Sequence, residues 1–417
     1  MSPSRLNDQK SPGSGIGRIR HILILTVGMP LLILGLIEGS LHLFRVNTEG
    51  VRSSTFKIGV PLWAYDEANM SLAGDIYRQI LDNELPAESA RWLDLFTRDR
   101  DVYYKMKPGI DTRVTNTVNR RELEREIRVH MHSSAEGFRT EDIPVEKGPG
   151  VFRIACLGDS TTFGWGVNQK ERFSHLLQEK LNCLKDPRTF QVLNFGIPGY
   201  TSHHGLQVLE HYVLKYAPDL VILSFGANDG RKIPSAIKKM LLQPTLVQRI
   251  KGVLSRFKTY RLLRKLLLSL YNPLDRHMDQ KDARIAREPF VTPSEYSRNL
   301  EEFIDTGRKH GFRTILLGLC CPLDYMAKMS AVGRREGVLA VDGMHLLLGQ
   351  LKAIEEGTAF QNEADWYRDL YGAEILRKRR ILYVTSDSCH PNIIGHRILA
   401  GFLLEKLVDN GYLTPED

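Results

Sequence analysis

The sequence lacks the patterns that mark zinc-stapled, disulfide-rich and nucleic-acid-binding chains. Its five cysteines form an odd set without CxxC spacing, so they predict neither a zinc site nor a full disulfide framework, and we expect most of them to be small core residues. No zinc-finger spacing, RNA-binding signature or interleaving of aromatic and basic residues accompanies the formal net charge of +8, so no nucleic-acid partner is predicted. The cysteines are Cys156, Cys183, Cys320, Cys321 and Cys389.

Long apolar runs are also lacking, with one exception near the N-terminus. Residues 21–44 read HILILTVGMPLLILGLIEGSLHLF. As a helix rising about 1.5 Å per residue they would extend ~36 Å, which exceeds a bilayer core of about 30 Å. A cleaved signal peptide is the alternative, but the run is longer than the apolar region of such peptides and no A-x-A-like site follows it. We therefore predict a transmembrane helix at 21–44, in which Pro30, Glu38 and His42 are interpreted as structural.

The charges that flank this segment predict its orientation. Four basic residues and one acid, Asp8, precede it, so the positive-inside rule places residues 1–20 in the cytoplasm and the catalytic body on the outer side, periplasmic or extracellular, of the cytoplasmic membrane. Arg45, Arg52 and Lys57 follow the segment and weaken this bias. The preceding basic residues are Arg5, Lys10, Arg18 and Arg20.

Residues 46–150 contain several aromatic residues and are predicted to form a small N-terminal accessory module of uncertain fold. One strand is legible in it, because Ile127, Val129 and Met131 alternate with polar residues. His130 and His132 would share one face of that strand. They could bind a metal, but no third ligand is evident, so we favour a solvated strand face and predict no metal site.

Residues 151–417 have the alternating strand and helix pattern of an α/β domain. Short apolar runs (FRIACLG, QVLNF, DLVILSFG, FRTILLGL, ILYVTS) alternate with helical patterns such as ERFSHLLQEKLNCL and HGLQVLEHYVLKY. Nearly unbroken apolar strands separated by helices predict a parallel sheet covered on both faces, with ligands at the carboxyl ends of the strands. Two long stretches, 230–292 and 322–380, interrupt the alternation and are predicted to be insertions.

Four polar motifs follow predicted strands of this sheet. They are GDSTTFGWGV from Gly158, NFGIPGYTS from Asn194, FGAND from Phe225 and DSCHPN from Asp387. Each by itself has an ordinary interpretation as a helix cap or a turn. Those interpretations do not explain why a serine, a glycine loop, an asparagine and a carboxylate with a histidine all fall where strand ends converge.

In this order and spacing the motifs resemble the blocks of the SGNH, or GDSL, hydrolase superfamily over about residues 150–410. The resemblance implies a flavodoxin-like three-layer α/β/α sandwich that needs no cofactor. It makes Ser160 the nucleophile, Asp387 and His390 the rest of a catalytic triad, and Gly199 and Asn228 the oxyanion partners of the Ser160 amide. EGFRTED at 136–142 is also similar to membrane-anchored bacterial members of the superfamily.

The chemistry needs these residue types. A serine hydroxyl becomes a good nucleophile when a histidine takes its proton, and a carboxylate orients that histidine. Cys389 is the competing nucleophile, but adjacent side chains in extended backbone point apart, so we interpret it as a packed cysteine. His203 and His204 either touch the substrate or lie on a helix surface, and His396 belongs to a helix surface or the core. We expect Asp159 and Asp229 to hold loops through local hydrogen bonds.

The first insertion is strongly basic, because Arg231 to Lys265 contains no acidic residue. Its leucines and other apolar residues form two helical stripes of different phase, which predicts two helices or one broken near Tyr260. A cap with a solvated basic face is favoured over a membrane-surface role, although basic amphipathic helices serve both.

Three functions remain open at this stage. The leading hypothesis is a membrane-anchored esterase or deacylase that hydrolyses a small-molecule, lipid-linked or glycan ester. The first alternative is an O-acyltransferase that uses the same triad to modify a cell-envelope glycan. The second is a catalytically inactive scaffold on the same fold, because fold does not imply function.

Overall fold

The computed structural model describes residues 22–48, 50–52, 59–62, 92–115, 128–235, 238, 246–270, 287–384 and 389–413. Its centre is a five-stranded sheet with the strand order β13-β12-β9-β7-β8, and all neighbouring strands are parallel. In chain order the strands are β7 (Val151–Gly158), β8 (Thr189–Asn194), β9 (Leu220–Ser224), β12 (Arg313–Gly318) and β13 (Leu339–Asp342). The predicted α/β sandwich with a parallel sheet is therefore confirmed.

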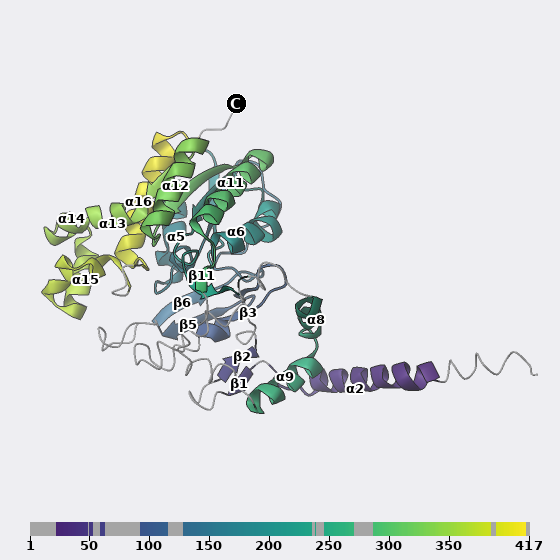
Figure 1. Ribbon diagram of the computed structural model, residues 1–417. Helices are drawn as coiled ribbons and strands as arrows, with labels where there is room; N and C mark the ends of the chain where they lie inside the picture. Colours follow the sequence, from purple (N-terminus) through teal and green to yellow (C-terminus); the bar gives the residue numbers. More distant parts are fainter. Residues whose placement is uncertain are drawn as a thin grey trace, which may run out of the picture.

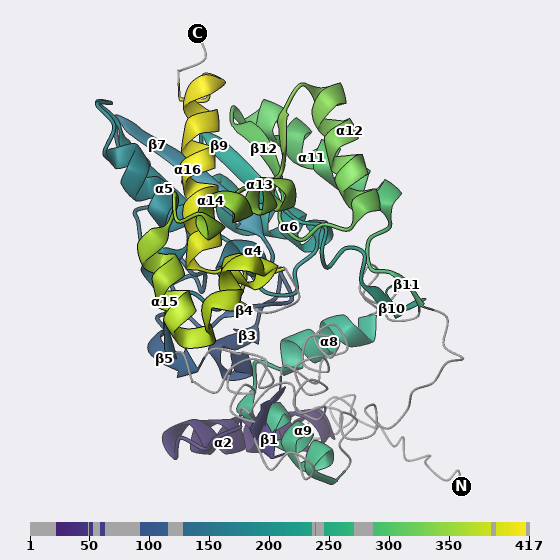
Figure 2. The same ribbon diagram turned by 90° about the vertical axis from the view of Figure 1, so that its left-hand side faces the viewer.

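Helices cover both faces of this sheet (Figures 1 and 2). The core on one face contains side chains of α5 (Phe173–Asn182) and α16 (Ile393–Asp409). The core on the other face contains side chains of α6 (Ser202–Val208), α11 (Pro293–His310) and α12 (Leu323–Glu336). Every residue of β9 is buried, which explains why its sequence, LVILS, is almost continuously apolar.

The described part of segment 92–150 packs onto the second face and shares its hydrophobic core. It contributes two antiparallel pairs, β3 (Phe96–Arg98) with β4 (Tyr104–Met106) and β5 (Asp111–Thr115) with β6 (Arg128–His132). Buried apolar side chains from this segment lie in one cluster with those of the sheet and its helices. On β6, Val129 and Met131 are buried while the two histidines are partly exposed, as the alternation predicted. Ile127 lies outside the described residues.

Two predictions about the C-terminal half are wrong. The run ILYVTS was predicted to be a strand, but its described residues form a 3-10 turn, Arg379–Leu382, and one isolated bridge from Tyr383 to Pro391. The fifth strand is β13, which lies inside the predicted insertion 322–380 together with α12. An apolar run of this length can belong to a buried turn or to a strand, and periodicity alone does not separate them.

The first insertion leaves the sheet after β9, and its described residues include α8 (Leu246–Leu254) and α9 (Lys258–Leu270), in agreement with the prediction of two helices or one broken near Tyr260. Its two ends pair with each other as short strands, β10 (Lys232–Pro234) and β11 (Arg287–Pro289). Near the N-terminus, η1 (Ile24–Gly28) and α2 (Met29–Leu43) form one helix of 20 residues with a mean hydropathy of 1.9, and its side chains contribute nothing to either core.

A buried arginine from the EGFRTED motif connects segment 92–150 to the loop that follows β7 and α4. The guanidinium of Arg139 is fully buried and donates five hydrogen bonds. Four go to carbonyl oxygens and the fifth goes to the side chain of Gln169. No carboxylate is among these acceptors, and burial lowers the pKa of Arg139 well below its ordinary value. The carbonyl acceptors belong to His130, Phe163, Gly164 and Val167.

We expect Arg139→Met to lower the free energy of unfolding by at least about 3 kcal/mol, because it leaves several buried carbonyl groups without a donor. Arg139→Lys should also be destabilised, since a lysine cannot reproduce the planar five-donor geometry. The control is Arg100→Met, whose side chain is 81% exposed and which should change stability by no more than about 0.5 kcal/mol. Chemical denaturation measures all three, and equal stability of Arg139→Met and Arg100→Met would contradict the structural role.

Candidate active site

Ser160 lies at the carboxyl edge of the sheet, at the first position of α4 (Ser160–Phe163). The turn is tight. A Cβ on Gly158 would lie 2.6 Å from the Ser224 carbonyl of β9, so only glycine fits there. Asp159 caps the helix by accepting hydrogen bonds of 2.8 Å from the Thr161 amide and hydroxyl. The turn therefore holds the Ser160 side chain half-buried at the end of β7.

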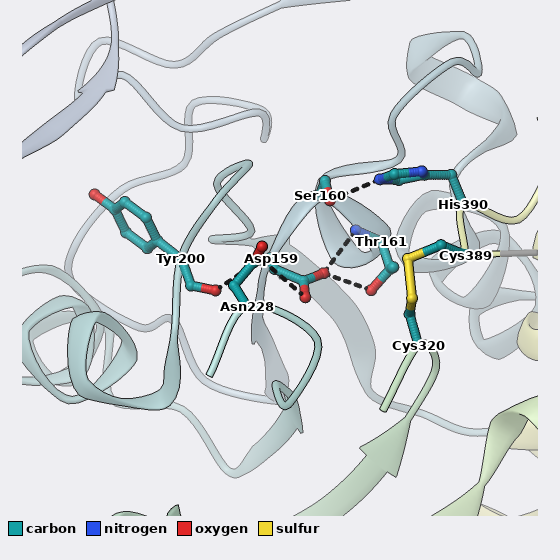
Figure 3. Close-up of a disulfide and its surroundings, with 8 residues drawn as sticks. All are labelled: Asp159, Ser160, Thr161, Tyr200, Asn228, Cys320, Cys389 and His390. Atoms are coloured by element: carbon teal, nitrogen blue, oxygen red, sulfur yellow. Dashed lines mark hydrogen bonds between the residues drawn. A yellow bond between two sulfur atoms is a disulfide. The ribbon is translucent and has the colours of Figure 1, made fainter. Parts of the chain in front are cut away.

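His390 meets this serine from the far end of the sequence. Its Nε2 lies 2.8 Å from the Ser160 Oγ, within hydrogen-bond distance (Figure 3). The segment that carries His390 precedes α16 and is positioned by Asn392. The Asn392 amide donates to the Ile381 carbonyl, and its side-chain oxygen caps α16. The pair therefore has the geometry of a nucleophile and its base.

The loops after β8 and β9 reach the same edge. Gly199 has a φ of +82°, a left-handed conformation that glycine adopts without strain. The Asn228 side chain donates to the Tyr200 carbonyl at 3.1 Å and to the Asp159 carboxylate at 3.4 Å. In Figure 3 the Asn228 side chain lies between Tyr200 and Asp159, on the opposite side of Ser160 from His390. The residues predicted for an oxyanion hole, Ser160, Gly199 and Asn228, are thus on loops that contact one another.

Asp229 connects the loop after β8 to the loop after β9. Its buried carboxylate accepts hydrogen bonds from the Ser202 amide and hydroxyl and from the Gly226 amide. Burial raises the pKa of Asp229 to about 7, against the opposing effect of these hydrogen bonds. Both aspartates, Asp159 and Asp229, therefore hold loops as expected.

Aromatic residues from distant parts of the chain pack behind the site. The Trp165 ring centroid is 6.3 Å from that of His390 and 4.1 Å from that of Trp92. Tyr104 donates to the Pro198 carbonyl beside Gly199, at 2.6 Å. Trp165 could have been noted from its place in GDSTTFGWGV. Nothing in the sequence linked Trp92 or Tyr104 to the catalytic motifs.

Cys389, which was interpreted as a packed cysteine, is part of a disulfide that the sequence did not predict. Cys389 forms a disulfide with Cys320, 69 residues away and just after β12. Sequence spacing gave no sign that these two positions meet. The bond fastens the residue next to His390 to the carboxyl end of β12, as Figure 3 shows. Cys156 and Cys321 are buried free cysteines, as expected, whereas Cys183 is exposed.

The remaining candidates divide between confirmation and correction. His204 is not on a helix surface. It is buried, its ring stacks on Tyr200, and burial lowers its pKa well below the ordinary value. His396 is a core residue that accepts a hydrogen bond from the Phe173 amide. Asp387 lies outside the described residues, so its place in the triad stays a prediction.

The histidines on β6 each face a carboxylate. His130 Nε2 is 2.6 Å from an Asp111 oxygen, and His132 Nε2 is 3.7 Å from a Glu141 oxygen. In the part of the chain that the structure describes, no group of three histidine, cysteine or carboxylate side chains is arranged to hold a metal ion.

Comparison with known proteins gives a consistent family. Residues 156–398 match the family model of the GDSL-like Lipase/Acylhydrolase family. An arylesterase of Vibrio mimicus is 32% identical over 95 residues, which are 21% of this chain and 46% of that protein, so the match spans less than half of the relative.

Solved structures are similar at lower identity. A lipase/acylhydrolase from Enterococcus faecalis is 17% identical, with 62% of this chain and 96% of that chain covered and a TM-score of 0.35. The psychrotrophic esterase EstA from Pseudoalteromonas sp. is 15% identical, with 63% and 99% covered and the same TM-score of 0.35.

Removing the disulfide should weaken both the fold and the position of His390. For a closed loop of this length, chain entropy predicts that the double variant Cys320→Ser, Cys389→Ser loses about 4 kcal/mol of unfolding free energy. We also expect a lower kcat, because the histidine segment then lacks its covalent tie. Cys183→Ser is the matched control and should change neither quantity. Thermal unfolding and ester hydrolysis are measured on both, and full activity in the double variant would show that the tie is not needed for catalysis.

Proposed function

Because the chain belongs to the GDSL-like lipase/acylhydrolase family, we propose that it is a membrane-anchored serine esterase or deacylase in which Ser160, His390 and Asp387 carry out the reaction. The observation that supports this most directly is the 2.8 Å approach of Ser160 Oγ to His390 Nε2 at the carboxyl edge of the sheet. These two side chains are 230 residues apart in the chain, and the ordinary interpretations of their motifs as a helix cap and a turn do not require them to be in contact.

The proposed reaction is a two-step acyl transfer. His390 Nε2 takes the proton as Ser160 Oγ attacks the ester carbonyl, and the protonated imidazole then gives it to the leaving alcohol. Asp387, three residues before His390, would orient the ring and stabilise its charged form. In the second step His390 takes a proton from a water as that water attacks the acyl carbonyl, and it then returns the proton to Ser160 Oγ as the acid leaves.

The oxyanion would form in front of the amides of Ser160 and Gly199. Asn228 would supply a third donor from its side chain. Its contact to Asp159 is long at 3.4 Å, so one amide hydrogen can turn to the developing charge while the bond to the Tyr200 carbonyl holds the side chain in place. Donors that are already positioned stabilise the transition state without reorganising, which makes them comparable in importance to the base.

The membrane part of the proposal is supported by the apolar helix and by the disulfide. The helix Ile24–Leu43 is long and apolar enough to cross a bilayer, and the basic residues before it favour a cytoplasmic N-terminus. Disulfides persist in oxidising compartments, so the Cys320–Cys389 bond favours a catalytic domain on the outer side of the membrane.

Substitution of the nucleophile tests the mechanism. Ser160→Ala should lower kcat on p-nitrophenyl acetate by at least about 10⁴-fold with the fold retained, because the hydroxyl is the attacking group. His390→Ala should be nearly as damaging and Asp387→Asn less so. The control is His211→Ala, an exposed histidine whose loss should leave kcat unchanged. Wild-type turnover by Ser160→Ala would refute the assignment. Repeating the assay with an acceptor glycan separates hydrolysis, where free acid stays the product, from acyl transfer.

The oxyanion assignment has its own signature. Asn228→Ala should lower kcat by about 10²- to 10³-fold with little change in KM, because the lost donor acts mainly on the transition state. Asn228→Asp keeps the shape of the side chain but places a carboxylate where negative charge develops, so it should be at least as slow. A change confined to KM in Asn228→Ala would instead indicate a role in substrate binding.

A further inference from the structure

Exposed apolar side chains in the described residues are concentrated in two places. One is the N-terminal helix, whose leucines and isoleucines face outward all round. The other is the helix pair of the basic insertion, where the exposed side chains recur at helical spacing on α8 and again on α9. Elsewhere in the described part of the chain only four large apolar side chains are exposed, and they are scattered: Val145, Leu323, Trp366 and Val408. The apolar surface that needs a cover is thus confined to α2 and to α8 with α9.

These two places are joined by reciprocal capping. The Glu38 carboxylate of α2 accepts hydrogen bonds of 2.7 and 2.8 Å from the Lys258 and Thr259 amides and one of 2.7 Å from the Thr259 hydroxyl. It therefore satisfies the first amides of α9 and places an acid at the positive end of that helix. In return, Lys258 Nζ donates to the Leu41 and Val46 carbonyls at the end of α2. Figures 1 and 2 both show α9 beside α2.

These contacts set the depth of the helix pair relative to α2. Glu38 lies five residues before the end of α2 at Leu43, about 8 Å along the helix axis at ~1.5 Å per residue. Farther along α9, Lys265 Nζ donates to the Asn47 carbonyl, beyond the end of α2. The helix α9 therefore starts beside the final turns of the apolar helix and runs outward from there. Among the described residues of the insertion, the junction of α8 and α9, residues 253–259, lies beside the final turns of α2.

The side chains at this junction have the character of a lipid interface. Val253, Leu254 and Phe257 are 56%, 39% and 48% exposed, although they are large and apolar. Arg256 is exposed between them, and Lys258 lies beside Glu38. An apolar edge bordered by basic residues is the composition of segments that lie in the headgroup region of anionic membranes.

We propose that the junction of α8 and α9 inserts into the outer leaflet of the bilayer that α2 spans. Leu254 and Phe257 then lie among the upper acyl chains, and Arg256 lies at the phosphates of anionic lipids. The inference rests on the proposed membrane anchoring. It gives the acid inside the apolar segment a role, because the Glu38 carboxylate fastens the junction to the anchor.

The insertion that carries this junction starts next to a residue of the candidate site. The chain leaves the sheet at the end of β9, and β10, the first strand of the insertion, starts four residues after Asn228. In Figure 2, α4, which carries Ser160, lies on the side of the sheet that faces α8 and α2, while the C-terminus is at the opposite end.

Spin-label accessibility in the full-length chain tests the proposal. The protein is reconstituted in lipid nanodiscs on a Cys183→Ser background, and a nitroxide is attached at Phe257→Cys, Leu270→Cys, Ile33→Cys or Val408→Cys. Collisions with oxygen report lipid contact, and collisions with a water-soluble nickel complex report water contact. Val408 is a matched control, because it is an exposed apolar residue on a helix at the other end of the molecule.

The proposal predicts a depth order. The label at Ile33 should be in lipid, the one at Phe257 at the upper acyl chains, the one at Leu270 nearer to water and the one at Val408 in water. A label at Phe257 as accessible to nickel as the one at Val408, with Ile33 in lipid, overturns the proposal and leaves the anchor intact. Exposure of Ile33 to water shows instead that the anchoring has failed. Dipolar broadening between Phe257 labels without lipid contact would assign the surface to a second copy of the chain and also overturn the proposal.

The role of charge is tested with the same label. Adding phosphatidylglycerol to phosphatidylcholine nanodiscs should move the Phe257 label deeper, and Arg256→Gln should remove that shift. The control Arg298→Gln, an exposed arginine on α11, should leave the shift in place. An identical depth in both lipids would refute the contact with anionic headgroups.

Discussion

The parallel pairing of β7 with β8 on one side and β9 on the other brings the loops after these three strands to one edge of the sheet. Each loop carries one of the polar motifs, and each motif begins within a few residues of the end of its strand. Ser160, Gly199 and Asn228 therefore meet because of strand order, even though they are 29 to 68 residues apart in the chain. The proposed chemistry depends on this arrangement, since a nucleophile and its oxyanion donors must share one small space.

Buried polar groups hold the three loops in register. Asp159 binds Thr161 and Asn228, and Asp229 binds Ser202 and Gly226, so the two carboxylates connect the loops after β7 and β8 to the loop after β9. A buried polar group without partners costs free energy, and these carboxylates avoid that cost only when all the loops are in place. Arg139 does the same for the loop after α4, where its five hydrogen bonds make segment 92–150 a structural part of the site.

His390 is held differently from Ser160. No strand of the sheet delivers His390. Its segment is fixed at one side by the disulfide to Cys320 and at the other by Asn392, which caps α16 and binds the turn before it. These two ties hold the imidazole of His390 in place without a strand. The disulfide also favours a location in an oxidising compartment, where such bonds persist.

The sequence by itself determined four of the five strands, the helices that cover the sheet, and the candidate positions Ser160 and His390, because short buried strands and the motifs that end them are local patterns in the sequence. It also determined Val129 and Met131 as a buried face and the two helices of the basic insertion. Only the tertiary structure decided that Cys389 pairs with Cys320, that Trp92 and Tyr104 support the site, that β13 and not ILYVTS completes the sheet, and that Glu38 caps α9. Each of these is a contact between residues far apart in the chain, and the pattern around one partner carries no information about the other until the fold brings them together.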